Sequence, residues 1–202
     1  MRRMTSFPLI LVAVALMATS ALAGADVGSK APDFTLKDTE GKEVVLQGFL
    51  DDGKIVVLEW FNPDCPFIKK HHANHKTMNE TYAKFAEKDV VWLAINSGAA
   101  GKQGAGLERN QKAVKEYEMP FPVLMDESGE VGKAYGARTT PHMFIVTPDG
   151  KVAYAGAIDD DRSADKLGKT NYVAEALSEL TGGKAVSVTE SKAYGCSVKY
   201  AK

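Results

Sequence analysis

Cys65 stands where a predicted strand gives way to a predicted helix, a position that can make a thiol reactive. The apolar residues 55–58 (IVVL) are typical of a buried strand, and 62–63 (NP) end it. Pro66 suits the first position of a helix, where its missing N–H costs nothing. The Cys65 sulfur would then lie near the free N–H groups of the helix start, which favour a thiolate. The pattern predicts a nucleophilic cysteine, with an inert, packed cysteine as the alternative.

The elements that must position Cys65 indicate an α/β protein. A helix is expected from Pro66 to Glu87, and residues 90–95 (VVWLAI) are expected to form a second buried strand. A strand, a helix and a strand in this order make a βαβ unit with parallel strands. The remaining expected elements are a hairpin at 34–46, a helix at 107–117, a strand at 121–125, a helical turn at 131–135, a hairpin at 143–157 and a helix at 171–180.

Residues 1–23 have the pattern of a secretory signal peptide. Arg2 and Arg3 precede the apolar run 9–17, and 21–23 (ALA) is a small-residue cleavage pattern, so cleavage is expected after Ala23. The apolar run is too short to span a bilayer comfortably, so no stable membrane insertion is expected after cleavage. These features predict a periplasmic or secreted protein. Its single folded domain would comprise residues 24–202, with a C-terminal extension at 183–202.

Charge and composition exclude several classes of function. The chain has 25 basic and 26 acidic residues, which argues against nucleic acid as a partner. The glycine-rich stretch 96–106 fits no phosphate-binding spacing and is expected to be a flexible surface loop. The acidic run 159–161 is expected to be a solvated patch. No cofactor is expected.

Cys196 is the second of only two cysteines, too few for a disulfide scaffold. In an oxidising compartment, two cysteines form a single bridge, a redox pair, or both. We predict that Cys196 folds back to Cys65 and resolves its adducts, meaning that it attacks the Cys65 sulfur and expels the partner. A purely structural bridge and two unpaired thiols are the alternatives.

Two motifs resemble those of a known family. The segment 60–69 (WFNPDCPFIK) resembles the W-C-x-x-C-K active-site segment of thioredoxins, with Ile68 in place of the second cysteine. Thr140-Pro141 resembles the dipeptide whose cis proline faces the active-site cysteine. Several short motifs and the tail 195–199 (GCSVK) resemble the peroxiredoxin-like redoxins of the alkyl hydroperoxide reductase/thiol-specific antioxidant superfamily. The short motifs include 121–124 (FPVL), 135–136 (YG), 149–150 (DG) and 159–160 (DD).

The resemblance implies a thioredoxin-like α/β fold. A central mixed sheet would be flanked by helices, with an N-terminal hairpin and a cysteine-bearing C-terminal tail. Glu59 matches the buried acid beneath the thioredoxin cysteines, and a buried carboxyl is suited to exchange a proton. A Glu59 that faces water at a strand edge is the alternative. The predicted substrate groove comprises Pro66, Thr140, Pro141 and His142; for His142, a merely packed or solvated side chain is the alternative.

The predicted activity is exported thiol–disulfide oxidoreduction through Cys65 and Cys196. The partners would be protein thiols or disulfides and an external thiol reductant. A thiol peroxidase, with an antioxidant role on a small peroxide, is one alternative. The threonine and proline expected in its site are replaced by Asn62 and Leu58. A copper-handling or noncatalytic redoxin is the other alternative, because His71 and His75 would lie one helical turn apart.

Overall fold

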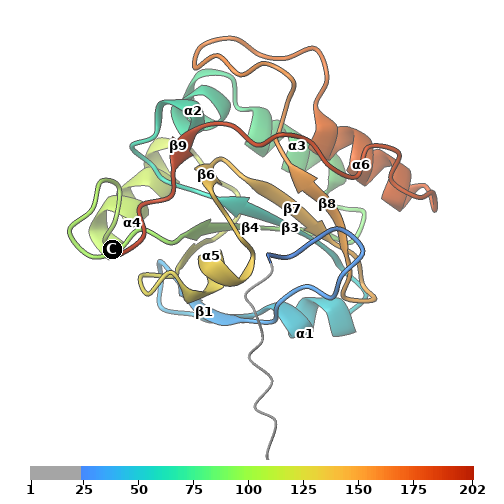
Figure 1. Cartoon of the computed structure of the whole chain (residues 1–202), viewed down its shortest axis with the longest axis horizontal. Helices are drawn as coiled ribbons and strands as arrows, with labels where there is room; N and C mark the ends of the chain where they lie inside the picture. The colour runs from blue at the N-terminus through green and yellow to red at the C-terminus, as the bar shows by residue number, and fades with distance from the viewer. Residues whose placement is uncertain (1–23) are drawn as a thin grey trace, which may run out of the picture.

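The computed structural model describes residues 24–202, in which helices cover both faces of a central sheet (Figure 1). The predicted signal peptide lies outside these residues. The sheet has the order β2-β1-β5-β4-β3-β7-β8 and is mixed, since β3, β4 and β5 run parallel and the other pairings are antiparallel. The strands are β1 (Thr35–Asp38), β2 (Glu43–Val45), β3 (Ile55–Trp60), β4 (Val90–Asn96), β5 (Val123–Met125), β7 (Met143–Val146) and β8 (Val152–Gly156).

The helical elements confirm the predicted βαβ unit and add one helix that was not predicted, α1. They are α1 (Leu46–Asp51), α2 (Pro66–Lys69), the π-helical turn η1 (Lys70–Asn74), α3 (Thr77–Phe85), α4 (Leu107–Glu116), α5 (Glu130–Ala134) and α6 (Tyr172–Thr181). None of the helices within 24–202 is long and apolar enough to cross a membrane.

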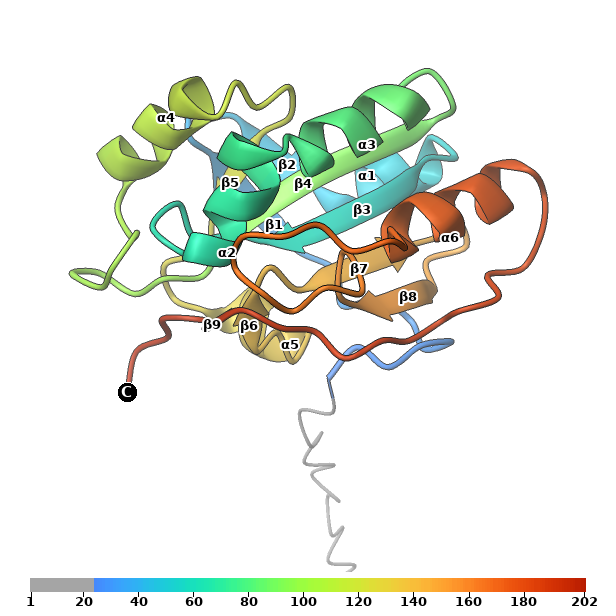
Figure 2. The same cartoon turned by 90° about the horizontal axis from the view of Figure 1, so that it is seen from above.

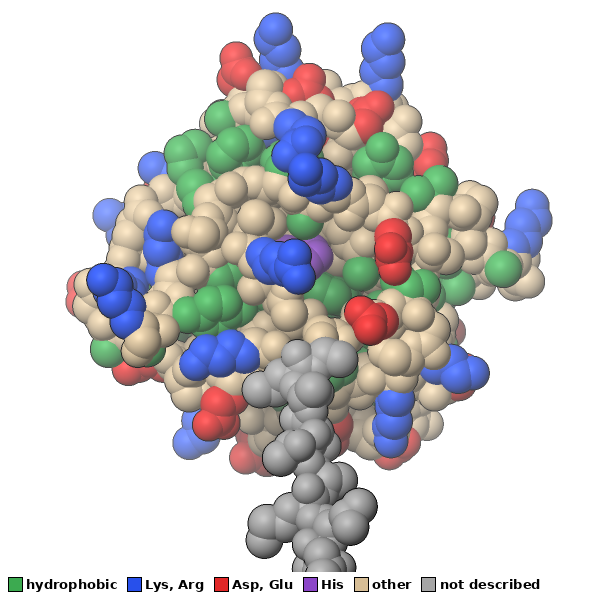
Figure 3. Space-filling view, viewed as in Figure 1, with side chains coloured by type: hydrophobic (Ala, Val, Ile, Leu, Met, Phe, Trp, Pro, Cys, Tyr) green, Lys and Arg blue, Asp and Glu red, His purple; other side chains and the backbone are tan. Residues whose placement is uncertain are grey.

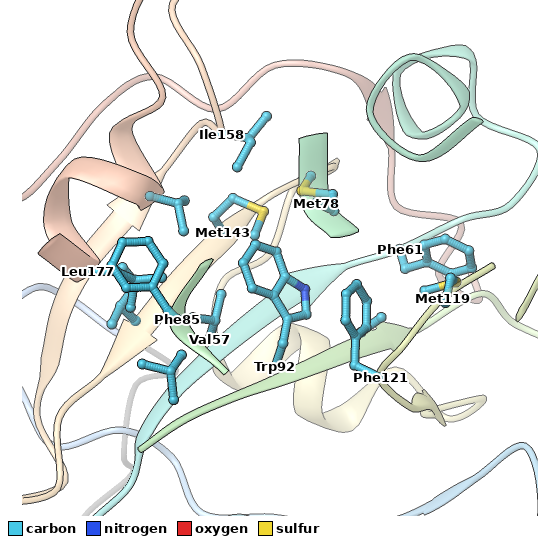
Figure 4. Packing of buried hydrophobic residues seen from close by; sticks show 14 of the residues in the cluster. Val57, Phe61, Met78, Phe85, Trp92, Met119, Phe121, Met143, Ile158 and Leu177 are labelled. Carbon is cyan, nitrogen blue, oxygen red and sulfur yellow. The ribbon is translucent and has the colours of Figure 1, made fainter. Parts of the chain in front are cut away.

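Strand β3 divides its side chains between two cores, because successive residues of a strand point to opposite faces. Val57 joins Cys65 and residues of α3, α4 and α6 in one cluster, part of which Figure 4 shows around Trp92. Leu58 and Trp60 join residues of α1 and α5 in the other. All six residues of β3 are buried, as the apolar run predicted.

The prediction of one continuous helix from Pro66 to Glu87 is wrong. The helix widens into the π turn η1, and Lys76, with φ of 51°, separates that turn from α3. A π turn holds one extra residue, so it changes which side chains face inward. Three consecutive residues, Lys70, His71 and His72, are buried as a result.

Two loops are more buried than the sequence indicated. Asp159 of the acidic run is buried, because its carboxylate lies 3.6 Å from the buried Lys70 ammonium. Gly104 of the glycine-rich stretch is also buried, and its carbonyl accepts hydrogen bonds from Asn96 and Asn110. A Cβ at Gly104 would lie 1.9 Å from the Asn62 side chain, so this loop packs tightly against the turn before Cys65.

The C-terminal tail runs back across the molecule to the Cys65 end of the sheet. It first pairs with the edge of β8, where Ala155 exchanges backbone hydrogen bonds with Thr189 and Ser191. It then forms strand β9 (Cys196–Ser197), which pairs antiparallel with β6 (Thr139–Thr140). Figures 1 and 2 both show β9 beside β6. The tail thus brings the second cysteine to the first.

Candidate functional site

Cys65 caps the start of α2, and Pro66 occupies the first turn as predicted. The Cys65 side chain is 0% exposed and belongs to the hydrophobic cluster on the α3 face of the sheet. Its sulfur lies 3.0 Å from the carbonyl oxygen of Thr140, which accepts the S–H. An external reagent therefore has no direct path to Cys65 in this conformation.

The turn that carries Cys65 is fixed from two sides. The Asp64 N–H donates to the Asn62 side chain at 2.9 Å, and the Asp64 carboxylate pairs with Arg109 at 2.8 Å. The Tyr117 hydroxyl donates to the Pro63 carbonyl at 2.6 Å. These contacts hold the Cys65 backbone in one geometry.

Cys196 lies against Cys65. Its backbone pairs with Thr140, whose carbonyl also contacts Cys65, and its side chain packs on the Cys65 cluster. Both cysteines are free thiols. Burial, followed by the hydrogen bond and charge of Cys65, raises the pKa of Cys196 to about 12. Cys196 therefore holds its proton at neutral pH while Cys65 stands beside it.

The four predicted groove residues do not share one surface. The Thr140–Pro141 peptide is cis, both residues are buried, and β9 covers Thr140. Pro66 is exposed. His142 instead lines a separate cavity of about 560 Å³, together with Arg138 and residues of the tail, and Cys65 does not line it. Burial, followed by the charge of Arg138, lowers the pKa of His142 to about 4, so this imidazole is neutral at pH 7.

Glu59 is buried on the Cys65 face of the sheet, not at a strand edge facing water. Its Oε1 lies 2.6 Å from His72 Nε2, and the Trp92 indole N–H donates to its Oε2 at 2.9 Å. Glu59 and His72 are both 0% exposed. A proton lies between the carboxyl and the imidazole, beneath the helix that Cys65 begins. Glu59, His72 and Trp92 thus form a hydrogen-bonded polar cluster inside an otherwise apolar core.

A second buried polar cluster holds the tail. The Lys70 ammonium donates to the carbonyls of Asp161 at 2.7 Å and Ser163 at 3.1 Å, and to the Tyr194 hydroxyl at 3.3 Å. The Tyr194 hydroxyl in turn donates to Asp159. Burial, followed by the hydrogen bond to Asp159, raises the pKa of Tyr194, so this hydroxyl keeps its proton.

The histidines near Cys65 are engaged in other contacts. His71 Nε2 lies 2.9 Å from the Tyr194 hydroxyl and must be the donor, because that hydroxyl gives its proton to Asp159. His75 Nε2 contacts the Asp165 carbonyl at 3.0 Å. Burial, followed by the charge of Lys70, lowers the pKa of His71 to about 3. Within 24–202 no group of three or more His, Cys, Asp or Glu side chains is placed to hold a metal ion.

Sequence reasoning missed Lys70, Asp159 and Tyr194. The pair Lys69-Lys70 on a helix and the acidic run 159–161 in a loop are both typical of solvated surface. Nothing in the sequence therefore indicated that Lys70 and Asp159 are buried. Tyr194 lies directly before the tail motif 195–199. Its large aromatic ring, in a stretch of mostly small and polar residues, was a sign that the tail packs against the protein.

The family model described as the AhpC/TSA family matches residues 27–155 of the chain. A curated relative, the thiol-disulfide oxidoreductase ResA of Bacillus thuringiensis subsp. konkukian, is 34% identical over 127 residues. The match covers 63% of this chain and 67% of the relative.

Solved structures resemble the chain over a longer span. A hypothetical protein from Sinorhizobium meliloti 1021 is 29% identical with a TM-score of 0.79, covering 89% of this chain and 97% of that one. The thioredoxin domain of a thiol-disulfide oxidoreductase from Bacteroides vulgatus is 24% identical with a TM-score of 0.54, covering 64% of this chain and 87% of that one. The latter likeness confirms a thioredoxin-like fold.

Proposed function

Because the chain belongs to the AhpC/TSA family and is a thiol–disulfide oxidoreductase, we propose that Cys65 is its nucleophile and Cys196 its resolving thiol. The observation that carries this proposal is the shared contact with Thr140, which brings both cysteines to one backbone group. Ile68 occupies the place of the second cysteine of a W-C-x-x-C-K segment and is buried, so the tail supplies the second thiol instead.

In the first step, the Cys65 thiolate attacks one sulfur of a partner disulfide. A mixed disulfide forms between Cys65 and the partner, and the other partner sulfur leaves as a thiolate that takes up a proton. The start of the helix at Pro66 supports the Cys65 thiolate through its free N–H groups. The tail must shift for this step, because Cys65 is 0% exposed.

In the second step, Cys196 loses its proton and attacks the Cys65 sulfur. The Cys65–Cys196 disulfide forms and the second partner thiol leaves, so the partner gains two electrons and the protein loses two. An external thiol reductant returns the protein to its dithiol form. We assign the proton transfer at Cys196 to Glu59, supported by its burial with His72 on the Cys65 face of the sheet.

The partner is proposed to be a protein thiol or disulfide. On the face shown in Figure 3, basic and acidic side chains are interspersed, so this face favours neither a polyanion nor a polycation. Export to the periplasm or outside the cell is proposed from the signal-like sequence of residues 1–23.

The test is turnover of a peptide disulfide with dithiothreitol as reductant. Cys65→Ser is expected to abolish turnover. When the peptide disulfide is added without dithiothreitol, Cys196→Ser is expected to accumulate a covalent Cys65–peptide adduct, visible by mass spectrometry, because the protein has no second thiol to resolve it. Full activity of Cys65→Ser would contradict the proposal. Faster oxidation of Cys65 by micromolar hydrogen peroxide than by the peptide disulfide would instead favour the peroxidase alternative.

A further inference from the structure

The C-terminal tail is anchored on both sides of Cys196. Before Cys196, the Tyr194 side chain is buried against Phe67 of α2, with ring centroids 5.7 Å apart. After Cys196, the Val198 N–H donates to the Arg138 carbonyl at 3.0 Å, and the Tyr200 hydroxyl donates to a backbone carbonyl at 2.8 Å. Cys196 is therefore held between two fixed points.

The anchor before Cys196 is the more specific of the two, because it satisfies buried charges. The Tyr194 hydroxyl donates to Asp159 and accepts from Lys70 and His71. The Lys70 ammonium also lies 5.1 Å from the centre of the Tyr194 ring. Without this hydroxyl, the buried Lys70 ammonium and the buried Asp159 carboxylate would each lose one hydrogen bond, which is costly for a charged group. Tyr194 thus has one strongly preferred place.

Gly195 allows the backbone beside Tyr194 to approach Thr140 closely. A Cβ at Gly195 would lie 2.1 Å from the Thr140 carbonyl oxygen, and the residue has φ of 131°, which side chains disfavour. The same carbonyl oxygen contacts the Cys65 sulfur. Gly195 therefore lets the tail settle directly over the Cys65 site.

We propose that Tyr194 is a positioning residue whose anchorage between Lys70 and Asp159 holds Cys196 against Cys65. This inference rests on the proposed roles of the two cysteines. The anchorage has two opposite consequences. It shields Cys65 from outside reagents, and it presents Cys196 to Cys65 once Cys65 has reacted.

The two consequences can be measured separately with dithiobis-nitrobenzoate, a symmetric aromatic disulfide. The Cys65 thiolate attacks its S–S bond, which forms a Cys65 mixed disulfide and releases one coloured thionitrobenzoate anion. The Cys196 thiolate then attacks the Cys65 sulfur, which forms the protein disulfide and releases the second anion. The first release depends on reagent concentration and reports access to Cys65. The second is first order and reports how Cys196 is positioned.

Tyr194→Phe keeps the ring and removes only the hydroxyl. We expect the first release to become about tenfold faster and the second about tenfold slower, as for loss of one hydrogen bond to charged groups. Gly195→Ala is expected to shift both rates in the same directions. Tyr82→Phe on α3 and Gly48→Ala on α1, where a Cβ meets nothing within 4 Å, are the matched controls and should leave both rates unchanged.

Opposite shifts of the two rates are the signature of a positioning role, because general loosening of the fold does not slow one step while accelerating the other. Rates within twofold of wild type in both test variants, or rates that rise or fall together, would overturn the inference. Failure of the underlying function looks different. If Cys65 and Cys196 do not have the proposed roles, the wild-type protein will release no second anion, or Cys65→Ser will release as much anion as wild type. Either result would overturn both the proposed function and this inference.

Discussion

His71 and His72 are neighbours on the π turn η1, yet they serve two different buried clusters. His72 contacts Glu59 of β3, which in turn accepts from Trp92 of β4. His71 contacts Tyr194 of the C-terminal tail. The first cluster joins a helix to two central strands of the sheet. The second cluster joins the same helix to the C-terminal tail.

This difference between the two clusters indicates which part of the site is rigid and which part can move. Strands β3 and β4 pair along six consecutive residues, from Ile55–Val90 to Trp60–Ile95, so Glu59 and Trp92 keep their places unless the sheet opens. The tail pairs with β6 over two residues only, so the Tyr194 cluster can open locally. The Glu59–His72 pair thus belongs to the core, and Cys196 is carried by the part that can open locally.

The largest expected effect is the loss of the rigid cluster around Glu59. His72→Leu would leave the Glu59 carboxyl buried with Trp92 as its remaining partner. We expect a loss of about 3–5 kcal/mol in the free energy of unfolding, measured by urea denaturation. His71→Leu is the matched control and should cost clearly less, because Tyr194 keeps Lys70 and Asp159. Equal losses of unfolding free energy in the two variants would contradict the difference between the two clusters.

Removing the buried Lys70 ammonium should destabilise the C-terminal tail more than the central sheet. For Lys70→Met we expect a loss of about 3 kcal/mol in the free energy of unfolding, because the buried Asp159 carboxylate loses its ammonium but keeps the Gly168 N–H and the Tyr194 hydroxyl. Amide hydrogen exchange should become faster at residues 186–200 while β3 and β4 stay protected. Lys69→Met, its exposed neighbour, should change stability by no more than about 0.5 kcal/mol. Faster exchange in β3 as well would contradict a locally opening cluster.

The pH dependence of stability should separate the two histidines further. Burial lowers the pKa of His71 from 6.5 to about 3, so between these values the unfolded chain binds a proton that the folded protein excludes. Stability should therefore fall as the pH drops below 6.5, by at most about 1.4 kcal/mol per pH unit for this residue. His71→Gln should reduce that slope between pH 6 and 5, measured by urea denaturation. An unchanged slope would mean that His71 is protonated in the folded protein.

The smallest expected effect concerns the stability of the disulfide. Without its hydroxyl, Tyr194 holds Cys196 less firmly at Cys65, so the bridge becomes easier to reduce. For Tyr194→Phe we expect the reduction potential of the cysteine pair to rise by about 20 mV, corresponding to about 1 kcal/mol. Equilibration with dithiothreitol buffers measures this potential, with Tyr82→Phe as the control. A potential that stays the same or becomes more negative would argue against the anchoring role.

Much of the framework could be predicted because its signals are local. The run 55–58 is apolar and β-branched enough to mark a buried strand, and Pro66 marks the first turn of the helix after Cys65. The resemblance of Thr140-Pro141 to a known dipeptide correctly implied a cis peptide. Pairing of Cys196 with Cys65 was also expected. The structure brings the two residues together, while their chemical roles stay predictions.

The remainder could not be predicted because it depends on contacts between distant segments. The π turn inserts a residue without changing the local composition, so the sequence indicated a regular helix with His71 and His75 one turn apart. Burial of Lys70 depends on Asp159, which lies in a loop far along the chain. No local pattern shows that two such residues will meet, and each alone is typical of solvated surface.

The redox state of the two thiols tests the central claim most directly. The protein would be equilibrated across dithiothreitol redox buffers and its free thiols trapped with a mass-tagged alkylating agent, beside Cys65→Ser and Cys196→Ser. If Cys65 and Cys196 form one couple, a single cooperative transition of two thiols will appear, and either variant will lose it. Two thiols that alkylate independently at every potential would contradict the account.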